Sequence, residues 1–120
     1  MAACIRASAP AGTAYSIAGD GSPLVLIHGV GLSKEMWGGQ LAGLAPRYQV
    51  IASDMLGHGA SRRPAAEATL DDYAGQLAEL LDHLALETAV VVGFSMGGLV
   101  ARAFALGHPQ RLDALVILNS

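Results

Sequence analysis

The apolar positions of this chain gather into short continuous runs separated by polar and glycine-rich segments. Residues 24–27 and 89–94 form such runs, residues 112–118 are apolar except for Asp113, and residues 48–53 hold a shorter run. Continuous apolar runs of this length are typical of strands buried on both faces, as in a parallel sheet. A weaker pattern in residues 5–17 predicts a short strand pair before the turn-forming residues Gly19 to Pro23.

Helical spacing is clearest in residues 69–86. Thr69 and Asp72 have the spacing of a capping box at the start of this segment. Polar side chains, Gln76 among them, are assigned mostly to the side opposite the apolar stripe. That stripe recurs at helical spacing and consists of Tyr73, Leu77, Leu80, Leu81 and Leu84.

Two further helices are predicted between the strands. Ser33 is a candidate cap for a helix that runs to about residue 45, before Pro46, and residues 96–106 form the other, with Gly107 as its C-terminal cap. Strands and helices therefore alternate along the chain. This alternation predicts an α/β fold, a mostly parallel sheet with helices on both faces. No repeat or linker divides the sequence.

Composition and charge narrow the class of protein. The chain has 120 residues, is 52% hydrophobic and carries a net charge of −3 without a run of like charge. Neither a nucleic-acid partner nor an anionic membrane is expected. Cys4 is the single cysteine, which predicts a reducing, cytoplasmic location. The histidines lack metal-ligand spacing, so no metal and no cofactor are expected.

The most specific chemical signal is Gly93-Phe94-Ser95-Met96-Gly97, a G-x-S-x-G string between a valine-rich strand and a helix. A serine in such a turn has a strained backbone, and the flanking glycines leave it room. The helix directs free N–H groups at the same point. Ser95 is thus a candidate nucleophile and the Met96 N–H a candidate oxyanion donor. The alternative is a tight packing turn with an incidental serine.

Two other motifs follow predicted strands, at His28-Gly29-Val30-Gly31 and at residues 54–59. Because the carboxyl ends of parallel strands share one edge of a sheet, these motifs are expected beside Ser95. The Val30 N–H is a candidate second oxyanion donor, with Gly29 and Gly31 allowing close approach to a substrate.

The remaining residues near these motifs are assigned structural roles. His28 and His58 lie in glycine-flanked turns, where a histidine can hydrogen-bond the local backbone rather than act as a base. Asp54 is interpreted as shaping its loop. Trp37 either covers the site or packs beneath it, and the sequence leaves this open.

The three ordered motifs, H-G-V-G-L at residues 28–32, D-M-L-G-H-G-A-S at 54–61 and G-F-S-M-G-G at 93–98, resemble the N-terminal half of the α/β-hydrolase fold family. The likeness covers residues 24–120 and is nearest to bacterial serine esterases and 3-oxoadipate enol-lactonases. It implies Ser95 as the nucleophile and the Val30 and Met96 amides as the oxyanion hole. The residues that support these motifs are His28, Gly29, Gly31, Gly93, Gly97 and Gly98.

The same resemblance implies hydrolysis of a small-molecule ester or lactone through an acyl-enzyme on Ser95. The alternatives are C–C bond hydrolysis or cofactor-free haloperoxidase or perhydrolase chemistry on the same elbow, and a non-catalytic receptor or scaffold. Epoxide hydrolases and haloalkane dehalogenases are not expected, because those relatives carry aspartate where Ser95 stands.

In the family the catalytic acid and histidine come later in the chain, as does the lid. Asn119 stands where some relatives place the acid, and it cannot act as a carboxylate. Residues 1–120 are therefore expected to be the N-terminal part of a single domain, inactive alone. Residues 112–118 are expected to form an exposed apolar edge.

Overall fold

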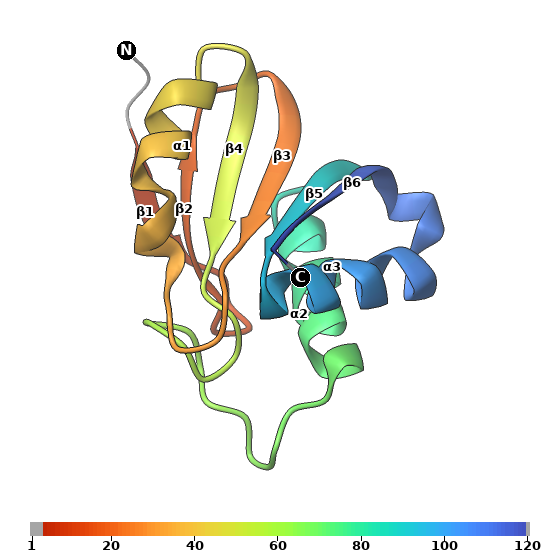
Figure 1. Cartoon of the computed structure of the whole chain (residues 1–120). Coiled ribbons are helices and arrows are strands. Elements are labelled where there is room, and N and C mark those ends of the chain that lie inside the picture. The colour runs from red at the N-terminus through yellow and green to blue at the C-terminus, as the bar shows by residue number, and fades with distance from the viewer. Residues whose placement is uncertain (1–3, 120) are drawn as a thin grey trace.

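The structure, a computed structural model, describes residues 4–119 and is built around a six-stranded sheet (Figure 1). The order of strands across the sheet is β1-β2-β4-β3-β5-β6. The β1–β2 and β2–β4 pairs are antiparallel, and β4, β3, β5 and β6 are mutually parallel. The strands are β1 (Ile5–Ser8), β2 (Ala14–Ala18), β3 (Ser22–Ile27), β4 (Tyr48–Ser53), β5 (Ala89–Phe94) and β6 (Leu112–Leu118).

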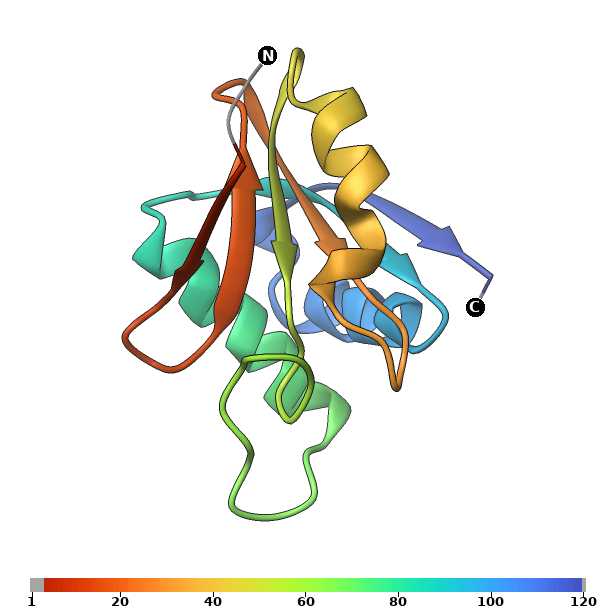
Figure 2. The same ribbon diagram turned by 90° about the vertical axis from the view of Figure 1, so that its left-hand side faces the viewer.

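Helices cover both faces of this sheet. On one face lies α1 (Gly38–Leu44), preceded by the short 3-10 helix η1 (Lys34–Trp37), and on the other lie α2 (Leu70–His83) and α3 (Met96–Gly107) (Figures 1 and 2). A second 3-10 turn, η2 (Pro109–Arg111), leads into β6. The predicted α/β class and mostly parallel sheet are confirmed.

The continuous apolar runs are explained by burial on both faces. In β3, Val25 and Ile27 pack in the cluster that includes α2 and α3, whereas Leu24 and Leu26 pack in the cluster that includes α1. Side chains point alternately to the two faces of a strand. When both faces are buried, both sets of side chains are apolar, and the sequence shows no alternation. Trp37 is buried in the α1 cluster. Of the two positions considered from the sequence, it therefore packs beneath the surface rather than covering the site.

The helix boundaries differ in detail from those predicted. The segment capped by Ser33 begins as the 3-10 turn η1 before continuing as α1. Helix α2 has the predicted Thr69–Asp72 capping box but ends at His83, because Ala85 adopts a φ of 57°. Gly107 is the last residue of α3 rather than its cap, and His108 takes the cap position.

Gln76 contradicts the predicted polar face of α2, because its side chain is buried. It lies on the same side of the helix as Tyr73 and Leu80, at spacings of three and four residues. Its amide faces the loop that follows β4, where polar backbone groups require partners.

Strand β6 lies at one end of the strand order, as predicted for residues 112–118. Its apolar side chains from Leu115 to Leu118 are each more than a third exposed. No helix among residues 4–119 is long and apolar enough to cross a membrane.

Candidate active site

Ser95 occupies the sharp turn between β5 and α3. Its backbone has a φ of 56° and a ψ of −119°, in the left-handed region that residues with a Cβ rarely adopt. Such a conformation costs about 1–3 kcal/mol and persists only when its surroundings impose it. Here the Ser95 N–H donates to Leu118 O at 2.9 Å, and Ser95 O accepts from the Gly98 N–H at 2.9 Å.

The glycines around Ser95 are required by close backbone packing. A Cβ on Gly93 would overlap the backbone of Gly97, and a Cβ on Gly97 would overlap the carbonyl groups of Ile27 and His28. The first turn of α3 therefore rests directly against the end of β3. This contact brings the Ser95 turn and the loop after β3 together, as predicted from their strand-end positions.

The loop after β3, residues 28–33, lies beside Ser95. A Cβ on Gly29 would be 3.4 Å from the Ser95 Cβ and 3.3 Å from the Phe94 ring. Gly31 has a φ of 76°, and the Leu32 N–H donates to Gly29 O at 3.2 Å, which makes a tight turn. Val30 is at the tip of this turn and is 64% exposed.

His28 is completely buried and both of its ring nitrogens contact backbone groups. Nδ1 lies 2.7 Å from Gly29 O, and Nε2 accepts from the Met55 N–H at 3.0 Å. These partners require the neutral tautomer with hydrogen on Nδ1. Burial lowers the pKa of His28, although the hydrogen bond to Gly29 opposes the shift. His28 thus hydrogen-bonds the backbone as predicted, and it has no free nitrogen with which to deprotonate Ser95.

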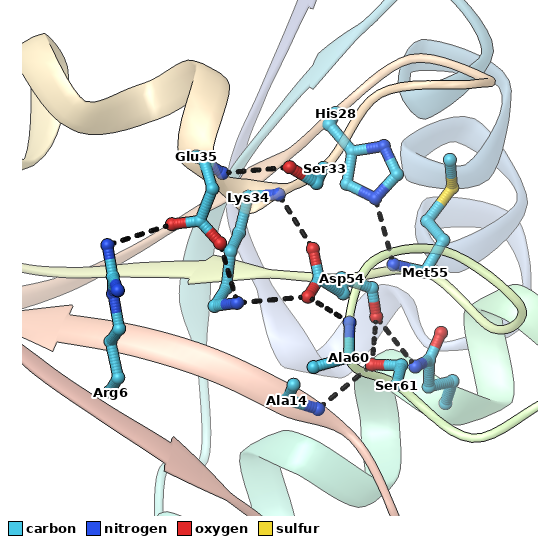
Figure 3. Close-up of polar contacts among 11 residues, drawn as sticks. Arg6, Ala14, His28, Ser33, Lys34, Glu35, Asp54, Met55, Ala60 and Ser61 are labelled. Atoms are coloured by element: carbon cyan, nitrogen blue, oxygen red, sulfur yellow. Dashed lines mark hydrogen bonds and ion pairs between the residues drawn. The ribbon is translucent and has the colours of Figure 1, made fainter.

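Asp54 organises the loop after β4. Its fully buried carboxylate accepts from the Lys34 N–H at 2.7 Å, the Lys34 Nζ at 3.0 Å and the Ala60 N–H at 3.0 Å (Figure 3). Burial alone would raise the pKa of Asp54, but the hydrogen bonds from Lys34 and Ala60 outweigh it and lower this pKa. A side chain on Gly59 would collide with the carboxylate. The predicted loop-shaping role is confirmed.

Lys34 is one of two residues near this site that sequence reasoning missed. Its side chain is buried, with Nζ 2.9 Å from Glu35 Oε1 as well as 3.0 Å from Asp54. Burial opposes the charged form, yet the contacts with Glu35 and Asp54 raise the pKa of Lys34. A lysine at the start of a helix gives no sequence signal of burial, because lysine is normally exposed.

Gln76 was also missed as a site residue. Its Nε2 donates to Asp54 O at 3.0 Å and to Thr13 Oγ1 at 3.1 Å, and its Oε1 accepts from the Leu56 N–H at 3.0 Å. Ser61 completes the set, donating from Oγ to Asp54 O at 2.6 Å. The helical spacing of Gln76 with Tyr73 and Leu80 is the signal that identifies it.

The other histidines either have contacts within the fold or are exposed. His58 contacts Leu56 O through Nδ1 at 3.0 Å, and its ring centroid is 5.0 Å from that of His28. His83 is exposed on α2, and His108 stacks on Phe104 at the end of α3. In residues 4–119 no group of three histidine, cysteine or acidic side chains is placed to hold a metal.

A hollow of about 550 Å³ lies near the opposite edge of the sheet, between the end of α2 and the residues that precede β5 and β6. Its guanidinium, Arg111, already contacts Asp82 at 3.0 Å and the carbonyl oxygens of Leu86 and Glu87. These contacts connect the end of α2 with η2, so this guanidinium is already engaged within the fold.

The resulting arrangement places a half-buried serine hydroxyl at the N-terminus of α3, beside a glycine-rich loop. The first N–H groups of a helix have no intrahelical acceptor and carry partial positive charge. A negative oxygen that develops next to Ser95 would meet donors of this kind. This is the layout of a nucleophile elbow.

Residues 22–120 match the family model described as alpha/beta hydrolase fold, so the chain belongs to that family. It is 42% identical over 106 residues to 2-hydroxymuconate semialdehyde hydrolase of Pseudomonas sp. strain CF600, covering 85% of this chain and 38% of that protein. It is 34% identical over 101 residues to 3-oxoadipate enol-lactonase 2 of Acinetobacter baylyi, covering 84% of this chain and 38% of that protein. The resemblance inferred from the three motifs is confirmed.

Among solved structures, an epoxide hydrolase from an endophytic Streptomyces superposes with a TM-score of 0.88 at 30% identity. The match covers 97% of this chain and 36% of that one. This chain thus spans less than half the length of these relatives. The comparisons support hydrolase chemistry in general.

Proposed function

We propose that the whole protein is a serine hydrolase that cleaves small carboxylic esters or lactones through an acyl-enzyme on Ser95. The observation that carries this proposal is the left-handed backbone of Ser95 at the strand-to-helix turn, packed against the loop after β3. A strained residue at a close-packed turn is maintained when the fold has a use for its geometry. Nucleophilic attack by the half-buried Ser95 hydroxyl is the use that best fits.

In this mechanism Ser95 Oγ attacks the carbonyl carbon and passes its proton to a general base. The N–H groups of Val30 and Met96 stabilise the oxyanion. When the tetrahedral intermediate collapses, the ester C–O bond breaks and the leaving alkoxide takes the proton. Water then hydrolyses the Ser95 ester to release the acid. Since His28 is engaged by the backbone, we place the base and its acid partner outside residues 4–119.

The Acinetobacter enol-lactonase supports a lactone or ester substrate. The second candidate, C–C bond hydrolysis, is favoured by the identity of 42% with the Pseudomonas semialdehyde hydrolase. The likeness to an epoxide hydrolase supports the fold, while the serine at position 95 favours acyl chemistry over epoxide opening. The cytoplasmic location stays a prediction.

Ester hydrolysis and labelling by a fluorophosphonate probe test the proposal in the whole protein. We expect turnover of p-nitrophenyl acetate and probe labelling, both lost in Ser95→Ala. Ser22→Ala, at the exposed first residue of β3, is the matched control and retains both ester turnover and probe labelling. Equal hydrolysis by Ser95→Ala would refute the assignment. Labelling without ester turnover, together with cleavage of a vinylogous 1,5-diketone, would favour the C–C hydrolase.

A further inference from the structure

Lys34 is a buried cation next to the loop after β3, and no step of the proposed reaction uses it. Asp54 holds this residue twice, through its backbone N–H at 2.7 Å and through its ammonium group at 3.0 Å (Figure 3). Lys34 is 6% exposed and Asp54 is fully buried. The pair therefore lies inside the protein, where neighbouring atoms hold its two side chains in one arrangement.

The loop that carries Val30 is anchored at both ends by two consecutive residues of the loop after β4. The Met55 N–H binds His28, the first residue of the loop, and the Asp54 carboxylate binds Lys34, which directly follows its last residue. Between these anchors, the Leu32 N–H to Gly29 O bond makes a turn, and Val30 at its tip is 64% exposed. The position of the Val30 N–H therefore depends on the anchors.

A buried ion pair of this kind is weak evidence for a stability role. Apolar side chains of similar volume are often as stabilising, because the charges lose their hydration. The pair instead restrains the position of Lys34 relative to the loop after β4. The Asp54 carboxylate accepts hydrogen bonds from Lys34 N, Lys34 Nζ and Ala60 N. These three hydrogen bonds restrict where residue 34 can lie.

We propose that Lys34 is a positioning residue that, through its ion pair with Asp54, holds the Val30 N–H at the distance from Ser95 that oxyanion stabilisation requires. This inference rests on the proposed serine-hydrolase function. The network continues from Lys34 to Glu35 and then to Arg6 on β1, where the Arg6–Glu35 pair is 3.4 Å apart and solvent-exposed. An exposed pair contributes little. The buried end of the network, rather than its outer end, is expected to affect catalysis.

The test compares Lys34→Met with the matched control Arg6→Met in the whole protein, using p-nitrophenyl acetate. We expect kcat of Lys34→Met to fall about 10- to 100-fold with KM unchanged, as for a misplaced catalytic group. Its affinity for a boronic acid, which forms a tetrahedral adduct on serine, falls by a similar factor. Amide ¹⁵N relaxation of Val30 shows increased motion. Arg6→Met leaves all of these values within twofold of wild type.

Lys34→Arg retains the cation and is expected to recover kcat to within about threefold of wild type. If Lys34→Met does not fold, Lys34→Gln takes its place under the same criteria. A folded variant with wild-type kcat and unchanged Val30 relaxation overturns the inference, as does a loss in Lys34→Arg equal to that in Lys34→Met. These outcomes are distinct from failure of the proposed function, in which wild-type protein shows no labelling or hydrolysis that depends on Ser95.

Discussion

The backbone N–H of Ser95 donates a hydrogen bond of 2.9 Å to the carbonyl oxygen of Leu118, the last residue of β6. The elbow is thus attached to the edge strand as well as to β5 and α3. Because Gly97 presses on the end of β3, three neighbouring strands determine where the Ser95 hydroxyl lies. The geometry of the elbow depends on the register of this part of the sheet.

Gly97→Ala is expected to destabilise the protein because its Cβ would overlap the carbonyl groups of Ile27 and His28, which are backbone atoms. Overpacking of this kind costs about 1–3 kcal/mol in free energy of unfolding. Gly107→Ala in the same helix is the control, since its Cβ meets no atom within 4 Å. Urea unfolding followed by fluorescence of the buried Trp37 measures both. Equal stability of the two variants would contradict this account.

Ser95→Gly and Ser95→Ala separate backbone strain from chemistry. Both remove the hydroxyl, but only glycine adopts a φ of 56° and ψ of −119° without a Cβ clash. We expect Ser95→Gly to be the more stable by about 1 kcal/mol, the strain relieved less the entropy that glycine adds to the unfolded chain. Thermal unfolding checks the difference. A less stable glycine variant would show that the turn is unstrained.

His28 is expected to make stability depend on pH below its ordinary pKa of 6.5. Burial lowers its pKa in the folded protein, so the unfolded chain binds more protons in this window. The free energy of unfolding therefore falls as pH decreases from 6.5 towards the folded pKa, and His28 contributes no slope above 6.5. Urea titrations at several pH values measure the slope, which His28→Asn reduces; His83→Asn, at an exposed position of α2, is the control. An unchanged slope in His28→Asn would mean that another group causes the dependence of the free energy of unfolding on pH.

Gln76→Ala is expected to destabilise the protein because it leaves the Leu56 N–H without its acceptor and Asp54 O with one donor fewer. An unsatisfied buried polar group costs about 1–3 kcal/mol. Glu79→Ala, one turn along α2 at an exposed position, is expected to stay within about 0.5 kcal/mol of wild type. Chemical denaturation compares the pair. Similar losses in both variants would mean that α2, rather than the Gln76 amide, is responsible.

Much of the fold was predictable because its signals are local. Each of the parallel strands contains an apolar run, and the capping box of α2 is formed by Thr69 and Asp72. The motif glycines indicated close backbone approach at the strand ends, which the positions of Gly93 and Gly97 confirm. The roles of Ser95, Val30 and Met96 in catalysis remain predictions that the experiments above address.

The sequence by itself determined the α/β class, the family and the three motifs at one sheet edge, since these follow from periodicity and from residues a few positions apart. Only the tertiary structure decided that Lys34 pairs with Asp54 and that His28 binds Met55, residues separated by 20 and 27 positions. Those pairs exist because β4 lies beside β3, which brings their following loops together. Strand neighbours are chosen by packing of the whole sheet, and a single sequence carries no local record of that choice.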